Sequence, residues 1–220
     1  MRTKIVPKKP PFKKHPLTIA VQACCYTLLG GLPLANAAVT GFQVVGGSGT
    51  ISQSGTNTTI NQASQNMAAN MQSLNVYANE QLRVNQPNAA SVALFRVLGN
   101  DGSTIAGRVD ANGRLILVNP NGVFFTSTAS LNVGSLIASG LDINPSDFMN
   151  GKYVFNEIAG TSGTVVNQGL INASLGGNVA LLGKQVKNEG LIQANLGTVT
   201  LAAGKEAVLA FNNGGFLGVR

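Results

Sequence analysis

Apolar residues alternate with small or polar residues through residues 164–211, and this segment contains a sequence that is written twice. The heptapeptide at 167–173 (Asn-Gln-Gly-Leu-Ile-Asn-Ala) returns at 188–194 (Asn-Glu-Gly-Leu-Ile-Gln-Ala), 21 positions later. Alternation with a period of two is typical of half-buried strands, and the Asn and Gly residues in between permit tight turns. A repeat of this length, made of short strands and turns, predicts the coil of a parallel β-solenoid.

The same alternation extends far upstream of the repeat. From Ser91 onward, short apolar runs end at turn signals such as 100–102 (Asn-Asp-Gly) and 110–113 (Asp-Ala-Asn-Gly). Gly113 precedes Gly177 by 64 residues, which corresponds to about three coils of 21. We therefore expect about seven or eight coils, stacked about 4.8 Å apart into a rod about 35 Å long, with asparagines at equivalent turns forming hydrogen-bonded ladders.

Some segments depart from the coil pattern. Residues 38–75 do not repeat, and we expect them to form an N-terminal cap, because the open end of a solenoid exposes strand edges that must be covered. Within this range, residues 62–75 are the stretch most compatible with a helix. Coils are expected over residues 76–220, interrupted by an excursion near 143–153 that would form a small hairpin or a short helix.

The first 37 residues have the features of a secretory signal peptide. Six basic residues precede a mostly apolar run, and residues 35–37 (Ala-Asn-Ala) have the small-x-small pattern of a cleavage site, so we expect cleavage between Ala37 and Ala38. A membrane anchor is the alternative, but the apolar run is short and is broken by Pro33. A lipid anchor at Cys24 is a weaker alternative.

Removal of this leader changes what the composition implies. Six of the 15 Lys and Arg residues lie in the leader, so the remainder carries nine basic residues against eight acids and has a net charge close to +1. A nucleic-acid partner is not expected, because such binding needs a basic face. Both cysteines and the histidine, His15, also lie in the leader, which excludes His- or Cys-dependent catalysis beyond residue 37. No metal and no cofactor are expected.

The acidic residues outside the leader are scattered, and most of them adjoin Gly or Asn in predicted turns. Some parallel β-helix proteins cleave polysaccharides with acids and bases on one face, and Asp101, Asp110, Arg108 and Arg114 could form such a cluster. We favour the interpretation that these are solvated turn residues. No catalytic residue is assigned, and the chain is not expected to be an enzyme.

The most specific short motif is Asn119-Pro120-Asn121-Gly122, which joins two apolar segments. Pro at the second position and Gly at the fourth predict a type I turn, and both Asn side chains can bond to nearby backbone groups. Two roles are open for this motif. It fixes the turn that closes a coil, or it helps a secretion partner to recognise the chain, and the residues themselves favour the first role.

At this motif the chain resembles a known family. The run 107–125, the preceding residues 91–97 (Ser-Val-Ala-Leu-Phe-Arg-Val) and the later residues 132–139 (Asn-Val-Gly-Ser-Leu-Ile-Ala-Ser) are similar to the N-terminal secretion domain of filamentous haemagglutinin-type exoproteins, the two-partner secretion adhesins. The similarity covers roughly residues 49–204. The resemblance implies an all-β fold, a right-handed parallel β-helix with an N-terminal cap and extra-helical β elements.

The resemblance also implies a role in export. The chain would cross the inner membrane through the Sec machinery, and a partner outer-membrane β-barrel transporter with periplasmic binding domains would then recognise it. Its final location would be the cell surface or the surroundings of a Gram-negative bacterium. The resemblance implies that the turn at 119–122 corresponds to the family's recognition motif. It also implies that Gln86, Pro87 and Asn88 correspond to a second turn of the family.

The expected function is therefore that of the secretion-recognition domain of a haemagglutinin-like adhesin, with a host-cell glycan or protein as a further partner. Met71 and Leu74 stand where the family often has Trp and Phe, and Phe95 stands where Asn is common. A polysaccharide-acting β-helix enzyme and a purely structural rod are the alternatives. Members of the family are usually far longer, so we expect the 220 residues to be the front of a larger exoprotein or the product of a truncated gene.

Overall fold

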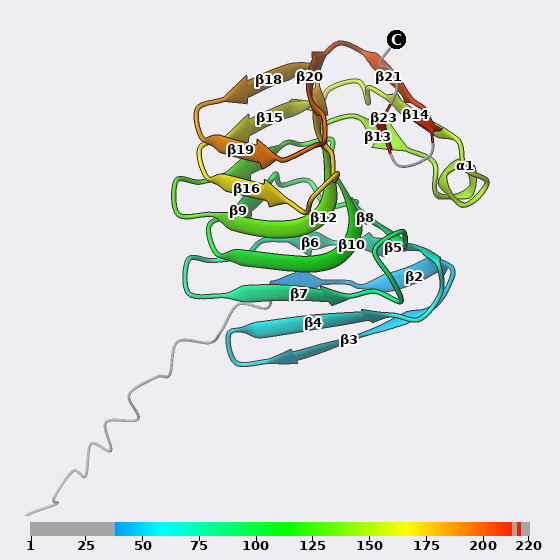
Figure 1. Ribbon diagram of the computed structural model, residues 1–220, viewed down its shortest axis with the longest axis vertical. Helices are drawn as coiled ribbons and strands as arrows, with labels where there is room; N and C mark the ends of the chain where they lie inside the picture. The colour runs from blue at the N-terminus through cyan, green and yellow to red at the C-terminus, as the bar shows by residue number, and fades with distance from the viewer. Residues whose placement is uncertain (1–37, 213–214, 217–220) are drawn as a thin grey trace, which may run out of the picture. The chain divides into compact units, whose positions relative to one another are not determined.

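The structure describes residues 38–212 and 215–216, so the predicted leader, including Ala37, lies outside the described residues. In this computed structural model the chain winds into about seven coils whose strands stack in parallel, as Figure 1 shows. The predicted all-β fold, a parallel β-helix, is confirmed. Within the described residues the helix α1 (Pro145–Met149) is short, and no helix is long and apolar enough to cross a membrane.

Three columns of strands form the sides of the coils. The first column consists of β4 (Asn57–Gln62), β7 (Gln81–Asn85), the first halves of β10 (Arg108–Val118) and β12 (Ser130–Ser139), β16 (Leu170–Ala173) and β19 (Leu191–Ala194). The second consists of β5 (Asn66–Met71), β8 (Val92–Val97), the second halves of β10 and β12, β17 (Val179–Gly183) and β20 (Val199–Ala203). The third consists of β9 (Ser103–Ile105), β11 (Val123–Phe125), β15 (Thr164–Asn167) and β18 (Gln185–Asn188).

Apolar residues at equivalent positions stack on one another inside the coils. In the first column Val109 lies beside Leu131, and Leu131 lies beside Ile171, while in the second column Leu136 lies beside Val179. These side chains are buried and belong to one continuous core. Each coil therefore covers apolar area left open by the coil before it, which stabilises the stack by about 25 cal/mol per Å² of apolar surface removed from water.

Glycines stack at the bend between the first and second columns. A Cβ atom on Gly134 would meet the carbonyl oxygen of Gly113, and one on Gly177 would meet that of Gly134, so only glycine allows the coils to approach this closely. Gly113 and Gly177 are therefore two coils apart, and the expectation of three coils is wrong. The coil that begins at Gly134 is 43 residues long because it contains the excursion.

Antiparallel strands cover the first coil at its N-terminal side. β3 (Gly49–Ser54) pairs with β4, β2 (Gln43–Gly46) pairs with β5, and β1 (Val39–Thr40) pairs with β6 (Ser73–Leu74). These strands occupy backbone groups that an uncovered edge would expose. Parallel stacking already begins at β4 and β5, inside the range 38–75 for which a cap is expected.

The expectation of a helix within residues 62–75 is wrong, because β5 occupies this range. Met67, Ala69 and Met71 point into the core, where they are at most 1% exposed. β5 pairs in parallel with β8 along its whole length. Stacking on the next coil thus overrides the weak helical preference of this Ala- and Met-containing stretch.

The second column is apolar on its outer face as well. Leu94, Ile116 and Ile137 belong to a second buried cluster, which an extra-helical layer covers. The layer consists of β13 (Asp142–Ile143), α1, β14 (Tyr153–Asn156) and β21 (Glu206–Leu209), followed by the ribbon of β22 (Phe211–Asn212) and β23 (Gly215–Phe216). The excursion, expected near residues 143–153, extends through β14 to Asn156. It holds both a short helix and part of an antiparallel sheet, and it supplies Phe148 and Phe155 to the second cluster.

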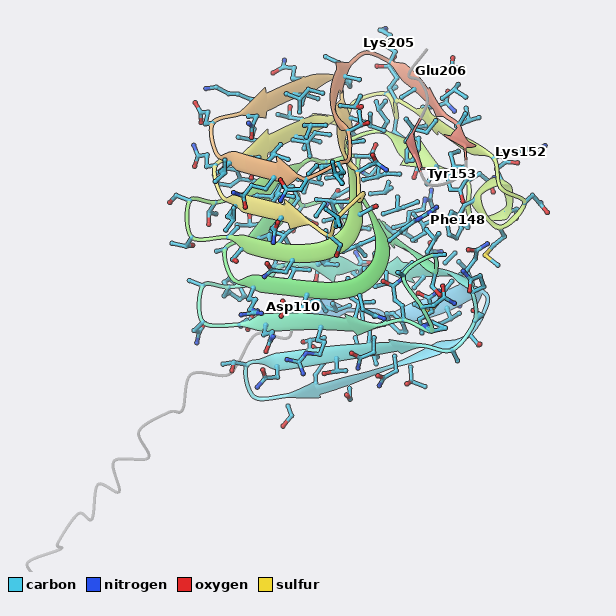
Figure 2. All side chains as sticks on the ribbon, in the orientation of Figure 1. Asp110, Phe148, Lys152, Tyr153, Lys205 and Glu206 are labelled. Atoms are coloured by element: carbon cyan, nitrogen blue, oxygen red, sulfur yellow. The ribbon has the colours of Figure 1, made fainter. Side chains whose placement is uncertain are left out.

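Local signals define this layer. The side chain of Asn144 accepts a hydrogen bond from the backbone N–H of Ser146 at 2.8 Å and so caps α1, which begins with a proline. Phe148 packs edge-on against Tyr153 with 5.9 Å between ring centroids, and Figure 2 shows both residues in the layer. β14 then pairs antiparallel with β21, which lies about 50 residues later in the chain.

An ion pair joins the extra-helical layer to the coils. Arg96 of β8 donates two hydrogen bonds to the carboxylate of Asp142 in β13, from Nε and from an Nη atom, each at 2.6 Å. The side chains are only 21% and 17% exposed. Bidentate pairs of this kind are stronger than single contacts, and removal of one member leaves the other without a partner in a poorly solvated place.

We expect Arg96→Ala to lower the free energy of unfolding by about 1.5–3 kcal/mol, because the carboxylate of Asp142 loses two charge-assisted hydrogen bonds. Lys187→Ala is the matched control, since Lys187 forms an exposed ion pair with Glu189, and its effect should stay within about 0.5 kcal/mol. Urea unfolding of both variants measures the difference. Equal effects would show that the Arg96 pair does not fasten the layer.

Candidate functional site

The sequence motif Asn119-Pro120-Asn121-Gly122 forms a tight turn between β10 and β11. The backbone N–H of Gly122 donates to the carbonyl oxygen of Asn119 at 2.9 Å, which closes a four-residue turn. Gly122 has a positive φ of 115°, a conformation that favours glycine. The turn thus redirects the chain from the second column to the third, as the motif predicts.

The side chain of Asn119 is fully buried and uses both ends of its amide. Its oxygen accepts from the backbone N–H of Asn121 at 2.9 Å. Its nitrogen donates to the carbonyl oxygen of Asp101 and to the hydroxyl of Ser103, each at 3.0 Å. Asp101 and Ser103 belong to the preceding coil, so Asn119 joins its own turn to that coil.

Asn121 and Pro120 extend these connections in both directions. The side chain of Asn121 donates to the carbonyl oxygen of Gly99 in the preceding coil at 2.8 Å. Toward the following coil, the hydroxyl of Ser162 donates to the carbonyl oxygen of Asn121 at 2.7 Å. The backbone N–H of Gly163 donates to the carbonyl oxygen of Pro120 at 2.8 Å. The turn is therefore fixed between the coil before it and the loop that starts the next strand of the third column.

Little of the motif remains available at the surface of the folded domain. Asn119, Pro120 and Gly122 are buried, and Asn121 is half-buried. Two surface hollows of about 210 and 310 Å³ adjoin the turn, and Asn121 lines both. Leu98 and Ile158, which line the smaller hollow, are 49% and 39% exposed. A partner that contacted the folded turn would meet these apolar side chains more readily than the Asn amides.

Comparison with known proteins identifies the architecture to which this turn belongs. Residues 35–215 match the TPS secretion domain family, the secretion domain of two-partner secretion exoproteins. The chain belongs to this family. A solved structure of the HMW1 secretion domain from Haemophilus influenzae shares the fold, with a TM-score of 0.75 and 32% sequence identity over 78% of this chain and 46% of the solved chain.

Two curated relatives are heme/hemopexin-binding proteins of Haemophilus influenzae. One is 38% identical over 76 residues, and the one from strain Rd is 44% identical over 64 residues. These matches span 34% and 29% of this chain but only 8% and 7% of the relatives. The shared part is thus a small piece of each relative, and the resemblance to two-partner secretion exoproteins inferred from the motif is confirmed.

The second turn predicted in the TPS domain centres on Gln86, a buried side chain that connects three coils. Its amide nitrogen donates to the side-chain oxygen of Gln62 in the preceding coil at 3.0 Å. The same nitrogen donates to the carbonyl oxygen of Arg114 in the following coil at 3.2 Å, and the Gln86 amide oxygen accepts from the N–H of Gly113 at 2.9 Å. Gln86 therefore fills the bend just below the glycine stack.

Pro87 and Asn88 of this second turn are exposed, in contrast to Gln86. The Asn88 side chain exchanges hydrogen bonds with that of Gln65 in the preceding coil, at 2.9 and 3.4 Å. Its oxygen also accepts from the N–H of Ala90 at 2.9 Å, as in an Asx turn. The two turns thus differ in what they offer to a partner, because only Pro87 and Asn88 present a motif at the surface.

The four residues considered as a catalytic cluster come from different parts of the coils. Arg108 and Asp110 form an ion pair at 2.6 Å on the outer face of the first column. Arg114 lies past the bend. Burial raises the pKa of Tyr153, and the charge of Arg114 opposes part of this rise. Asp101 is exposed in the loop before β9. Within the described residues, no group of three or more His, Cys, Asp or Glu side chains could hold a metal ion.

The expected side-chain ladders are present, although sequence analysis did not find all of their members. Asn167 donates to Asn188 of the next coil at 2.7 Å, as the repeat predicts. Gln62 and Gln86 form a similar contact that the sequence analysis missed. Their spacing of 24 residues, close to one coil, and their position at strand ends are the signals that could have found them.

We expect Asn119→Ala to lower the free energy of unfolding by about 2–3 kcal/mol, because the N–H of Asn121, the carbonyl of Asp101 and the hydroxyl of Ser103 lose their buried partner. Asn100→Ala serves as the control, since Asn100 is an exposed residue near the same turn, and its effect should stay within about 0.5 kcal/mol. Chemical denaturation of the purified domain provides the comparison. Similar stability of the two variants would contradict the structural role of the turn.

Proposed function

We propose that this TPS domain directs the export of a surface adhesin of a Gram-negative bacterium, and that the partner transporter recognises it before it folds. The observation that supports recognition before folding is the burial of the 119–122 motif. Asn119 is 0% exposed, and both ends of its amide are used inside the domain. A partner can read these amides directly only while the chain is still extended.

An extended chain offers a simple mode of capture. Its strands would present unpaired backbone N–H and C=O groups, and periplasmic binding domains of the outer-membrane transporter could add such a segment to a sheet edge by β-augmentation. Main-chain hydrogen bonds then supply affinity, and alternate side chains supply specificity. The Sec machinery would deliver the chain in this state after removal of the leader at Ala37 and Ala38.

Folding outside the cell would then favour outward movement. Each coil that reaches the surface stacks on the previous one and buries apolar residues, as Leu131 does on Val109 and Ile171 does on Leu131. A coil that has stacked cannot slide back through a pore without losing this burial. The free energy of folding thus opposes return of the chain, and the antiparallel strands of the first coil provide a surface on which stacking can start.

Heme and hemopexin binding belong to the names of the two curated relatives, and we do not assign these activities to this chain. The matched segments make up 8% and 7% of those relatives. This chain matches the TPS secretion domain over residues 35–215, so a shared export signal explains the shared segment better than a shared ligand. The proposed ligand of the adhesin is a host-cell glycan or protein.

Export assays can separate recognition of the unfolded chain from recognition of the folded surface. We expect the chain to reach the medium only in cells that make the cognate transporter, and we expect Asn121→Ala to reduce export several-fold. The double variant Leu98→Ser with Ile158→Ser changes the exposed apolar side chains beside the turn and should leave export unchanged. Immunoblots of medium and cell fractions measure the exported share.

Opposite results would identify a different role. If the Leu98 and Ile158 variant blocks export while Asn121→Ala does not, the transporter reads the folded surface. Export of the unchanged chain without any transporter would favour the purely structural rod. Thermal unfolding of each purified variant provides the folding control, because a domain that does not fold would lose the outward bias for a separate reason.

A further inference from the structure

The outer face of the first column differs from that of the second, because no layer formed by the described residues covers it and its middle row is polar throughout. Figure 1 shows this side of the stack free of the extra-helical layer. The row runs across seven neighbouring strands, and register pairs define its members. They are Ser52, Thr59, Arg83, Asp110, Asn132, Asn172 and Gln193.

A hollow of about 300 Å³ lies on this face. It is lined by Arg83, Asn85, Asp110, Asn112 and Asn132 together with the strand residues between them. Figure 2 places Asp110 on the first column, well away from the extra-helical layer. The hollow is therefore formed by side chains of β7, β10 and β12, whose backbones the parallel ladder holds in place.

Most polar groups of the hollow are already fixed by neighbours. Asp110 accepts from Gln81 and Arg108, each at 2.6 Å, and from Asn132 at 3.4 Å. Burial tends to raise the pKa of Asp110, but the hydrogen bonds from Arg108, Gln81 and Asn132 and the charge of Arg108 hold that pKa below its ordinary value. The carboxylate of Asp110 is therefore ionised near pH 7, and the positive charge of Arg108 balances it.

Asn112 and Asn85 are fixed in the same way. The side chain of Asn112 bonds to the backbone N–H and carbonyl of Gln86, at 2.7 and 2.8 Å. That of Asn85 donates to Asn61 at 2.8 Å and keeps its own oxygen available as an acceptor. Polar groups held in this manner lose little side-chain freedom when they bind a ligand, which is the condition for useful affinity from a shallow site.

Arg83 is the exception on this face. It is an exposed side chain whose guanidinium has no hydrogen-bond or ion-pair partner among the residues that the structure describes. The three charged residues of the face, Arg83, Arg108 and Asp110, leave a net charge of one positive unit, and this charge resides on Arg83. A guanidinium of this kind matches the planar fork of a carboxylate.

We propose that this face binds a polysaccharide that carries uronic acids. A sugar carboxylate would pair with Arg83, and sugar hydroxyls would bond to the fixed amides of Asn85, two residues further along β7, and of Asn132, two strands away in β12. The row places a polar side chain on each successive strand about every 4.8 Å, so an extended polymer bound at Arg83 can contact several strands at once. This binding is independent of the proposed export role, because it uses a different face and the folded domain alone.

Binding measurements on the purified folded chain test the proposal with three probes, namely fragments of polygalacturonate, alginate and hyaluronate. We expect at least one of them to bind, and we expect full methyl esterification of its carboxylates to weaken binding at least about tenfold. Arg83→Gln should have an effect of similar size. Lys152→Gln is the control, since it removes one exposed positive charge from the extra-helical layer and should change affinity less than about twofold.

Several results would overturn the proposal. These are absence of binding to all three polymers, equal binding of the esterified form, or an Arg83→Gln variant that binds as well as the unchanged chain. Equal weakening by Lys152→Gln would also overturn it, because the attraction would then depend on net charge and not on the hollow. Unchanged thermal unfolding of each variant shows that any loss of affinity is local.

Discussion

The hydrogen-bonded register between successive coils is the constraint on which the rest of this structure depends. Once β10 pairs with β12 and β12 with β16, the side chains of paired residues face the equivalent side chains of the next coil, and the register shifts only between Ala111 and Arg114 of β10. Apolar residues must then stack on apolar residues, as inside the core, and an amide such as Asn167 must meet an amide such as Asn188. A single register therefore accounts for the core, the ladders and the glycine stack at the bend.

The same constraint leaves the loops free. A coil needs strands that return in register, and it sets no limit on the chain between them, so the coil that begins at Gly134 can hold 43 residues. The extra chain emerges beside the second column, whose outer face carries Leu94, Ile116 and Ile137. These residues would otherwise form an exposed apolar patch, and covering them gives the extra-helical layer its second core.

Local patterns in the sequence were enough to predict the parallel coils, the 119–122 turn and the Asn ladder, because each depends on a short period or on a single turn. Contacts between distant segments could not be predicted in this way. The Arg96–Asp142 pair joins residues 46 positions apart, and β14 pairs with β21, which lies about 50 residues later in the chain. The prediction of a helix in residues 62–75 was wrong for the same reason. Met67, Ala69 and Met71 alternate as in a strand, but this strand is stabilised by pairing with β8, which lies later in the chain.

The hydrogen bonds of the turn also have an order along the chain, and this order suits folding during export. Asn119 and Asn121 bond to Gly99, Asp101 and Ser103, all of which precede them in the chain. The turn can therefore satisfy the buried amide of Asn119 on the coil already formed, whereas the buried amide of Gln86 also needs the following coil. The extra-helical sheet behaves differently, because β14 gains its second neighbour only when β21 has emerged. In the proposed export, coil stacking would therefore hold the chain first, and the pairing of β14 with β21 would follow it.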